Sequence, residues 1–129
     1  MANEQAVQTL IRLRGVVGAG AWVAPRLSGR LFGLDVAGNP QAPYLGRLFG
    51  VRDVALAFGL ASSAGPERAQ WLRVGIACDL ADAAAGLLAA RRGELPKLAT
   101  VLVTTTALAA AGLGAAALQG EQQPPTAAA

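Results

Sequence analysis

The sequence predicts an all-α protein, a bundle of four transmembrane helices that run alternately up and down. Hydrophobic residues make up 53% of the 129 residues and charged residues only 15%, against about 25% charged residues in an ordinary soluble domain. The mean hydropathy is +0.42. Four apolar stretches follow one another with short connections between them, an order typical of an up-down helix bundle.

The first apolar stretch predicts a span from about residue 10 to residue 31. Arg12 and Arg14 interrupt its beginning, so we expect both side chains to snorkel to one membrane interface. Pro25 is expected to bend the helix, because proline lacks a backbone donor and clashes with the preceding turn. Residues 33–43 are rich in Gly, Pro and Asn and predict an interfacial loop.

The second span is predicted from residue 44 to about residue 63, and the third has its apolar part at residues 74–90. Pro66 suits the first turn of the third helix. Two arginines and a glycine, residues 91–93, mark its end, because basic side chains and glycine favour helix C-termini.

The fourth span, residues 98–118, is the clearest because it contains no charged residue. At about 1.5 Å per residue it crosses the hydrocarbon core of a bilayer, roughly 30 Å thick. We assign residues 1–118 to one four-span membrane domain. Residues 119–129 are polar and aperiodic and predict a disordered tail. A soluble four-helix bundle is the alternative, but the fourth helix has no polar stripe to face water.

The positive charge lies at the edges of the apolar stretches. Ten arginines and one lysine leave a net charge of +3, and they occur one or two at a time, like the flanking charges of membrane spans. A nucleic-acid-binding protein gathers such residues on one face. We therefore expect a lipid bilayer as partner, no nucleic acid, and a multi-pass location in the bacterial inner membrane. The larger positive group marks the cytoplasmic side: Arg26, Arg30, Arg47, Arg91, Arg92 and Lys97.

The chain has no histidine and a single cysteine, Cys78. This composition excludes a disulfide within the chain, Cys/His metal sites, histidine-ligated haem and Ser-His-Asp triads. A membrane enzyme or redox subunit would lack a nucleophile with its base. We therefore expect no catalytic residues, no metal and no cofactor, and a protein that is not an enzyme.

Ionisable residues inside the second and third spans are the candidate functional residues. A lone charge at mid-bilayer costs from about 3 to more than 10 kcal/mol, so we expect these charges to be paired. The predicted buried polar cluster comprises Arg47, Arg52, Asp53, Asp79 and Asp82. Three carboxylates outnumber one central arginine. Either Arg47 or Arg73 therefore reaches inward, or one aspartate holds a proton.

Small residues share helix faces with these aspartates. The third span carries Gly75, Asp79, Asp82 and Gly86, and the second carries Gly46, Gly50, Asp53 and Ala57. Spacings of three and four residues place each set on one helix stripe. Because small residues let membrane helices approach closely, we expect Gly46, Gly50, Gly75 and Gly86 to pack against other helices.

The polar cluster allows three interpretations. It is structural and fixes helix register, as buried polar groups can, or it docks a membrane-protein partner or a second copy of the chain. Alternatively, the protein is a proton-coupled small transporter or channel subunit that uses Asp79 and Asp82. A binding site for a ligand or a lipid headgroup is the third interpretation.

The segments "RLFGVRDVALAFGL" and "GIACDLADAAAGLLAA" resemble a family of small, uncharacterised four-span membrane proteins of actinobacteria and other bacteria. That family pairs a G-R-x-x-G-x-R-D element in the second span with a D-x-x-D element in the third. The matching positions are Gly46, Arg47, Gly50, Arg52, Asp53, Asp79 and Asp82. Residues 24–35 also resemble its first inter-span region, and the layout is loosely similar to DoxX-like proteins. The resemblance covers most of the chain and implies a four-span topology without an established activity.

Overall fold

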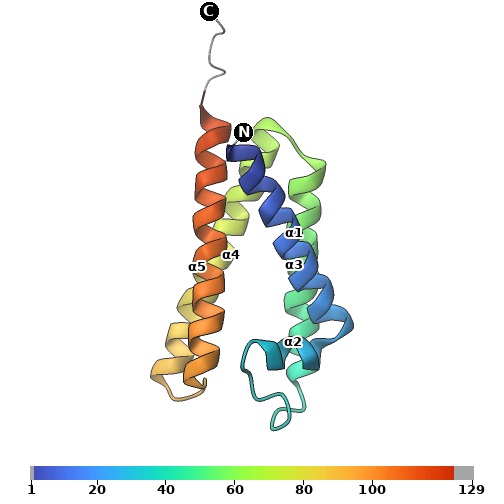
Figure 1. Ribbon diagram of the computed structural model, residues 1–129, viewed down its shortest axis with the longest axis vertical. Helices are drawn as coiled ribbons and strands as arrows, with labels where there is room; N and C mark the ends of the chain where they lie inside the picture. Colours follow the sequence, from blue (N-terminus) through green and yellow to red (C-terminus); the bar gives the residue numbers. More distant parts are fainter. Residues whose placement is uncertain (1, 124–129) are drawn as a thin grey trace, which may run out of the picture.

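Four long helices and one short helix form the computed structural model, which describes residues 2–123 (Figure 1). Within these residues no strand occurs. The helices are α1 (Ala2–Val23), α2 (Pro25–Leu31), α3 (Ala42–Ser62), α4 (Gly65–Arg91) and α5 (Lys97–Gln122). The predicted all-α fold class is confirmed.

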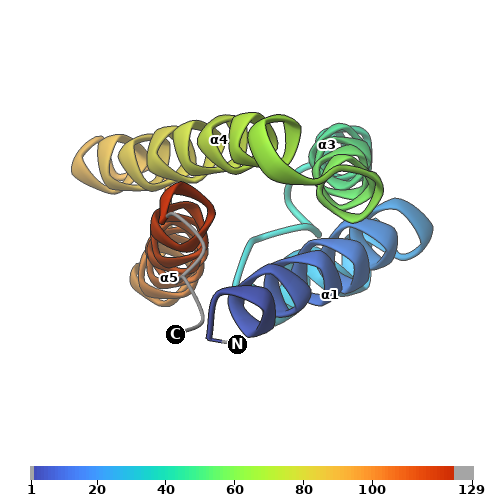
Figure 2. The same cartoon turned by 90° about the horizontal axis from the view of Figure 1, so that it is seen from above.

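The long helices run alternately down and up and associate in two pairs. α1 packs mainly along α3, and α4 mainly along α5; we call these the first and the second helix pair. The pairs converge where α1 begins and α5 ends, at the upper end of Figure 1, and separate toward the lower end. From above, the four long helices surround a common centre (Figure 2).

The first predicted span is two helices. Ala24 has φ −129° and ψ 63°, which interrupts the helix, and Pro25 begins α2, where its missing N–H is not needed. Gly33, with φ 75°, follows the end of α2 in the left-handed conformation that glycine adopts without strain. The helix is therefore interrupted at Ala24, directly before Pro25, and is not bent within one continuous span. Ala24 N–H still donates to the carbonyl of Gly20 and Ser28 N–H to that of Ala24, at 2.8 and 3.0 Å.

The other helix ends lie near their predicted positions, with one extension. α4 begins at Gly65, so Pro66 lies in its first turn as predicted. α5 continues to Gln122, so residues 119–122 are helical and do not belong to a disordered tail. The part of that predicted tail at residues 124–129 lies outside the described residues.

The hydrophobic core lies at the end where the two helix pairs converge. Val7 and Leu10 of α1 pack there with Leu60 of α3 and Leu72 of α4, and all four side chains are buried. At the same end the guanidinium of Arg68 forms ion pairs with two carboxylates, at 3.1 Å to Glu4 and 3.5 Å to Glu121. Aliphatic packing and ion pairs together hold the pairs at this end, whereas the opposite end is less tightly closed.

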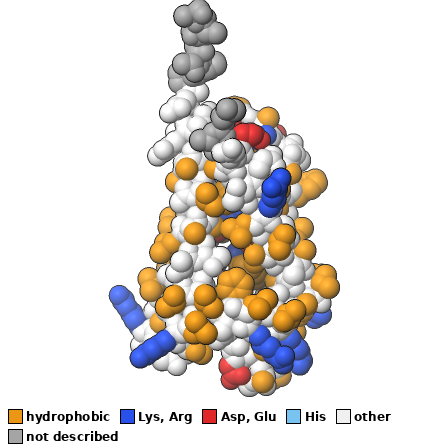
Figure 3. Space-filling view, in the orientation of Figure 1, with side chains coloured by type: hydrophobic (Ala, Val, Ile, Leu, Met, Phe, Trp, Pro, Cys, Tyr) orange, Lys and Arg blue, Asp and Glu red, His pale blue; other side chains and the backbone are white. Residues whose placement is uncertain are grey.

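One helix in the described part of the chain, α5, is long and apolar enough to cross a membrane by length and composition. α1, α3 and α4 have 22, 21 and 27 residues, but charged residues interrupt their apolar stretches. Large apolar side chains are nevertheless exposed on the outer faces, among them Val23 (78% exposed) and Phe58 (72%). Hydrophobic side chains of all sizes cover much of the middle of the face drawn in Figure 3, and most of the visible Lys and Arg side chains lie near its lower end.

Candidate functional site

Arg14 of α1 reaches across to the second helix pair. Its Nη2 atom donates a hydrogen bond to Oδ2 of Asp79 at 2.5 Å, and its Nη1 atom lies 3.5 Å from Oδ1 of Asp53 on α3. The three residues are only 3%, 4% and 6% exposed, respectively. One buried guanidinium therefore joins α1, α3 and α4.

A second arginine makes a parallel bridge from α3 to α4. Both terminal nitrogens of Arg52 donate to the carboxylate of Asp82, at 2.9 and 2.6 Å, and one also contacts Asp53 at 3.3 Å. This forked arrangement is the strong form of an arginine–carboxylate contact. The side chains of Arg52 and Asp82 are each 33% exposed, so this bridge lies nearer the surface than the Arg14 bridge.

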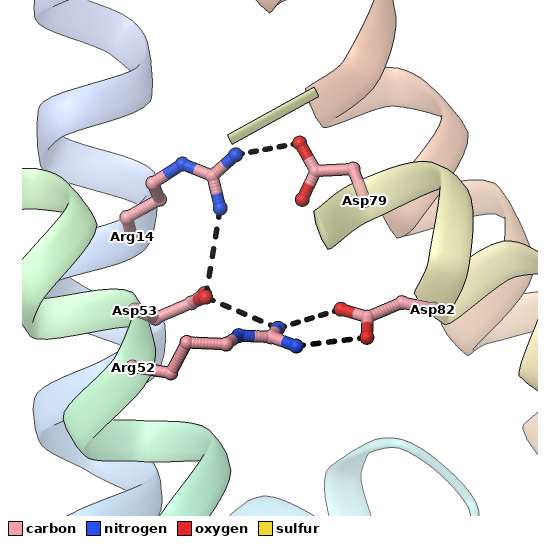
Figure 4. A network of polar contacts seen from close by, with 5 residues as sticks. All are labelled: Arg14, Arg52, Asp53, Asp79 and Asp82. Atoms are coloured by element: carbon pink, nitrogen blue, oxygen red, sulfur yellow. Dashed lines mark hydrogen bonds and ion pairs between the residues drawn. The ribbon is translucent and has the colours of Figure 1, made fainter. Parts of the chain in front are cut away.

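The five side chains form one chain of alternating charge (Figure 4). Its order is Asp79, Arg14, Asp53, Arg52 and Asp82. Asp53 is the central member, since its Oδ1 atom receives both guanidinium groups. With every group ionised, two positive and three negative charges leave a net charge of −1. We call this set the ion-pair network.

Four of the five residues predicted to form a polar cluster meet in this network, and Arg47 does not. Arg47 lies five positions before Arg52, which places it more than one turn away and on another face of α3. Its side chain is exposed, and Nε donates to the backbone carbonyl of Trp22 at 3.2 Å. That carbonyl is near the end of α1, where helical partners run out.

Arg14 takes the place that the sequence analysis gave to Arg47 or Arg73. Arg73 is exposed on α4. The expectation that the Arg14 side chain extends outward is wrong, because it is buried between the helix pairs. A signal was present: Arg14 stands four residues before Gly18, so the two share a helix stripe. Gly75 and Asp79 are also four residues apart, and from that spacing the sequence correctly predicted that both lie on a buried face of α4.

The predicted packing glycines all face another element. A Cβ added to Gly50 would lie 2.5 Å from the backbone oxygen of Gly18, and one added to Gly46 would lie 3.1 Å from Pro25. At Gly86 it would lie 3.0 Å from Oγ1 of Thr104 on α5. Backbone contact between α1 and α3 therefore requires glycine at two facing positions, one of which, Gly18, the sequence analysis missed.

Gly75 has a different role, because it makes room for the network itself. A Cβ at this position would lie 3.0 Å from Nη2 of Arg14. Gly75 is one helical turn before Asp79 on the same face of α4. The glycine therefore provides the space through which the guanidinium reaches the Asp79 carboxylate.

A cavity of about 640 Å³ lies between the helix pairs, next to the network. Arg14, Asp53, Asp79 and Asp82 line it together with two loop carboxylates. Most of its wall is apolar and includes Leu13, Val17, Phe32, Leu45, Phe49 and Val103. Figure 3 shows the surface hollowed between the two helix pairs. The arrangement is an apolar chamber with a charged patch in its wall.

Among residues 2–123, no group of three or more His, Cys, Asp or Glu side chains is arranged to hold a metal ion. Cys78 is a free, partly buried thiol on α4. Comparisons with protein-family models, curated proteins and solved structures find no match to this chain. The family resemblance drawn from the two sequence elements therefore stays a prediction.

Proposed function

We propose that the protein is an integral membrane bundle that holds a small apolar molecule in the cavity between its helix pairs. The cavity beside the buried ion-pair network is the observation that carries this proposal. Its volume, about 640 Å³, is within the range of roughly 300–1,000 Å³ typical of small-molecule sites. A largely apolar wall with a few polar groups at one place is also typical of such sites.

The membrane part of the proposal is that α1, α3, α4 and α5 each cross the bilayer. Helices of 21 residues or more reach roughly the 30 Å of a hydrocarbon core. The five charges of the ion-pair network, within α1, α3 and α4, face the bundle centre and are paired, the arrangement that intramembrane charges require. Arg12, Arg47 and Arg73 are exposed on the same helices, and their long side chains would extend toward the membrane interfaces. Exposed apolar side chains, such as those of Val16, Phe58 and Leu108, would contact lipid.

In this proposal the role of the ion-pair network is structural. α1 and α3 pack on each other, as do α4 and α5, and the network bridges these two units beside the cavity. Removing one member of a buried pair leaves an unpaired charge, which is strongly destabilising. The network would therefore keep the cavity at a fixed width while leaving its wall apolar.

Membrane integration is tested by extraction of membranes with alkaline carbonate. The protein is expected in the membrane pellet, like a multi-pass marker protein. Recovery in the soluble fraction would contradict the proposal and favour the soluble bundle.

Binding is tested with Nile red, a neutral apolar dye, added to lipid nanodiscs that contain the full chain. Ala85 lines the cavity from an open position on α4, and its neighbour Ala84 does not line it. Ala85→Trp is expected to remove the saturable fluorescence that exceeds that of empty nanodiscs, and Ala84→Trp to keep it. Equal binding by both variants would show that the dye does not enter the cavity.

A further inference from the structure

The charged lining of the cavity is predominantly acidic. One guanidinium, that of Arg14, contributes to the wall, against five carboxylates: Asp35, Asp53, Asp79, Asp82 and Glu94. Asp35 and Glu94 are exposed and belong to the two loops at the lower end. The other three belong to the ion-pair network. The charged groups in the apolar wall are therefore mostly carboxylates.

Two of these carboxylates have an oxygen without a partner. Asp79 accepts from Arg14 through Oδ2, and Asp53 receives both arginines through Oδ1. The other oxygen of each accepts no hydrogen bond within the described residues, as the bare oxygen of Asp79 in Figure 4 shows. Both residues are more than nine-tenths buried, and both line the cavity. Neither of these oxygens is enclosed by protein, so each is open to the cavity and can accept a hydrogen bond or contact a positive charge there, from water or from a bound molecule.

The two guanidinium groups do not direct free N–H groups into the cavity. Arg52 is absent from the cavity wall, and both terminal nitrogens of Arg14 are directed at aspartates. The Nε atoms of Arg14 and Arg52 have no acceptor among the described residues, but both atoms are closed off from any space that a water molecule could enter. Among the charged groups of the ion-pair network, the atoms that are open to the cavity and lack a partner are thus carboxylate oxygens.

We propose that the cavity binds a lipophilic cation, an apolar molecule with a single positive charge that lies against Asp53 and Asp79. The apolar walls take the body of the molecule, and the charge completes the ion-pair network, whose own sum is −1 when every group is ionised. A negatively charged molecule of the same shape is rejected by the acidic lining. This inference rests on the proposed function, since it names the ligand class of the same cavity.

The test uses two probes of nearly equal shape and opposite charge, tetraphenylphosphonium and tetraphenylborate. Each is dialysed to equilibrium against nanodiscs of zwitterionic phosphatidylcholine that contain the full chain. Matched nanodiscs with the Ala85→Trp variant correct for partition into lipid. Site-specific binding of the phosphonium is expected to be at least about tenfold tighter than that of the borate, because opposite charges attract strongly where water is scarce.

A charge variant shows whether the preference comes from the network. Asp79→Asn keeps an acceptor for Arg14 and removes one negative charge, so the phosphonium affinity is expected to fall about tenfold. Glu67→Gln is the matched control, since Glu67 is exposed on α4 and does not line the cavity. Nile red binding and the helical circular-dichroism signal show whether each variant is folded. If Asp79→Asn does not fold, the double variant Asp35→Asn/Glu94→Gln makes the same comparison from the loops.

The outcomes separate the two proposals. Loss of Nile red binding in Ala85→Trp, together with phosphonium binding no tighter than borate binding, overturns the inference and leaves the proposed function standing. Nile red binding that Ala85→Trp does not alter overturns the proposed function itself. Phosphonium selectivity that is unchanged by Asp79→Asn and by the loop variant also overturns the inference, because the carboxylates would then not be its source.

Discussion

Arg14 and Asp79 are 65 residues apart in the sequence, and their side chains meet at 2.5 Å between α1 and α4. Both are almost fully buried. α1 belongs to the first helix pair and α4 to the second, so this contact bridges two units that otherwise pack mainly within themselves. This guanidinium therefore contributes to the relative position of the helix pairs, together with the Arg52–Asp82 bridge and the hydrophobic core at the converging end.

The first prediction concerns this bridge. Arg14→Leu or Asp79→Leu alone is expected to lower the free energy of unfolding by about 3–5 kcal/mol, because each leaves a buried charge without its partner. The double variant is expected to lose less than the sum of the two, as contacting residues do. Unfolding in mixed detergent micelles, followed by circular dichroism, measures all three. Arg12→Leu is the control, since Arg12 is exposed on the same helix. Additive losses would show that the two side chains do not interact.

The Arg52–Asp82 bridge is expected to contribute less than the Arg14–Asp79 bridge. Its side chains are one-third exposed, so water screens the pair, and Arg52→Gln is expected to cost about 1–2 kcal/mol, between the values for exposed and buried pairs. Arg47→Gln, outside the network, is the control, with an expected effect below about 0.5 kcal/mol. The same unfolding measurement ranks the variants. If Arg52→Gln lowered the free energy of unfolding more than Arg14→Leu does, the expectation that the more buried bridge contributes more would be wrong.

A third prediction concerns the contact between α1 and α3. Gly50→Ala adds a Cβ that would lie 2.5 Å from the backbone oxygen of Gly18, and a backbone atom cannot rotate away. We expect destabilisation of about 1–3 kcal/mol as the helices separate. Gly112→Ala on α5 is the control, because nothing lies within 4 Å of its added Cβ. Removing a helical glycine there is expected to stabilise the protein by up to about 1 kcal/mol. Equal melting temperatures for the two variants would show that the α1–α3 contact is loose.

The fourth prediction tests the proposed topology. Single cysteines are introduced into a Cys78→Ala background and labelled in intact cells with a maleimide that cannot cross membranes. Four spans place Gln5→Cys and Glu121→Cys on one side and Arg91→Cys on the other, because α1 begins and α5 ends at the same end of the bundle. Cells opened with detergent give the full labelling reference. Labelling of all three positions from one side would exclude four crossings.

Local information was enough to predict the helices and several of their contacts. Apolar stretches, Pro25 and the basic residues with glycine at 91–93 determined where helices form and end, because these signals act within a few residues. The cost of an isolated charge in an apolar span predicted that Arg52 meets an aspartate of the next span. Gly50 was predicted as a packing residue from its spacing alone. Each of these inferences needs only one helix and its faces.

Only the tertiary structure decided which cation joins Asp79 and where the cavity lies. The sequence favoured Arg47 or Arg73 and placed Arg14 at a membrane interface. The actual choice depends on the rotation of each helix about its axis and on its register against distant neighbours. The cavity arises because the helix pairs converge on the core around Leu10 and Leu72 and separate below it. That divergence is a relation between whole helices. No local stretch of sequence encodes this divergence, because it results from contacts among side chains of all four long helices.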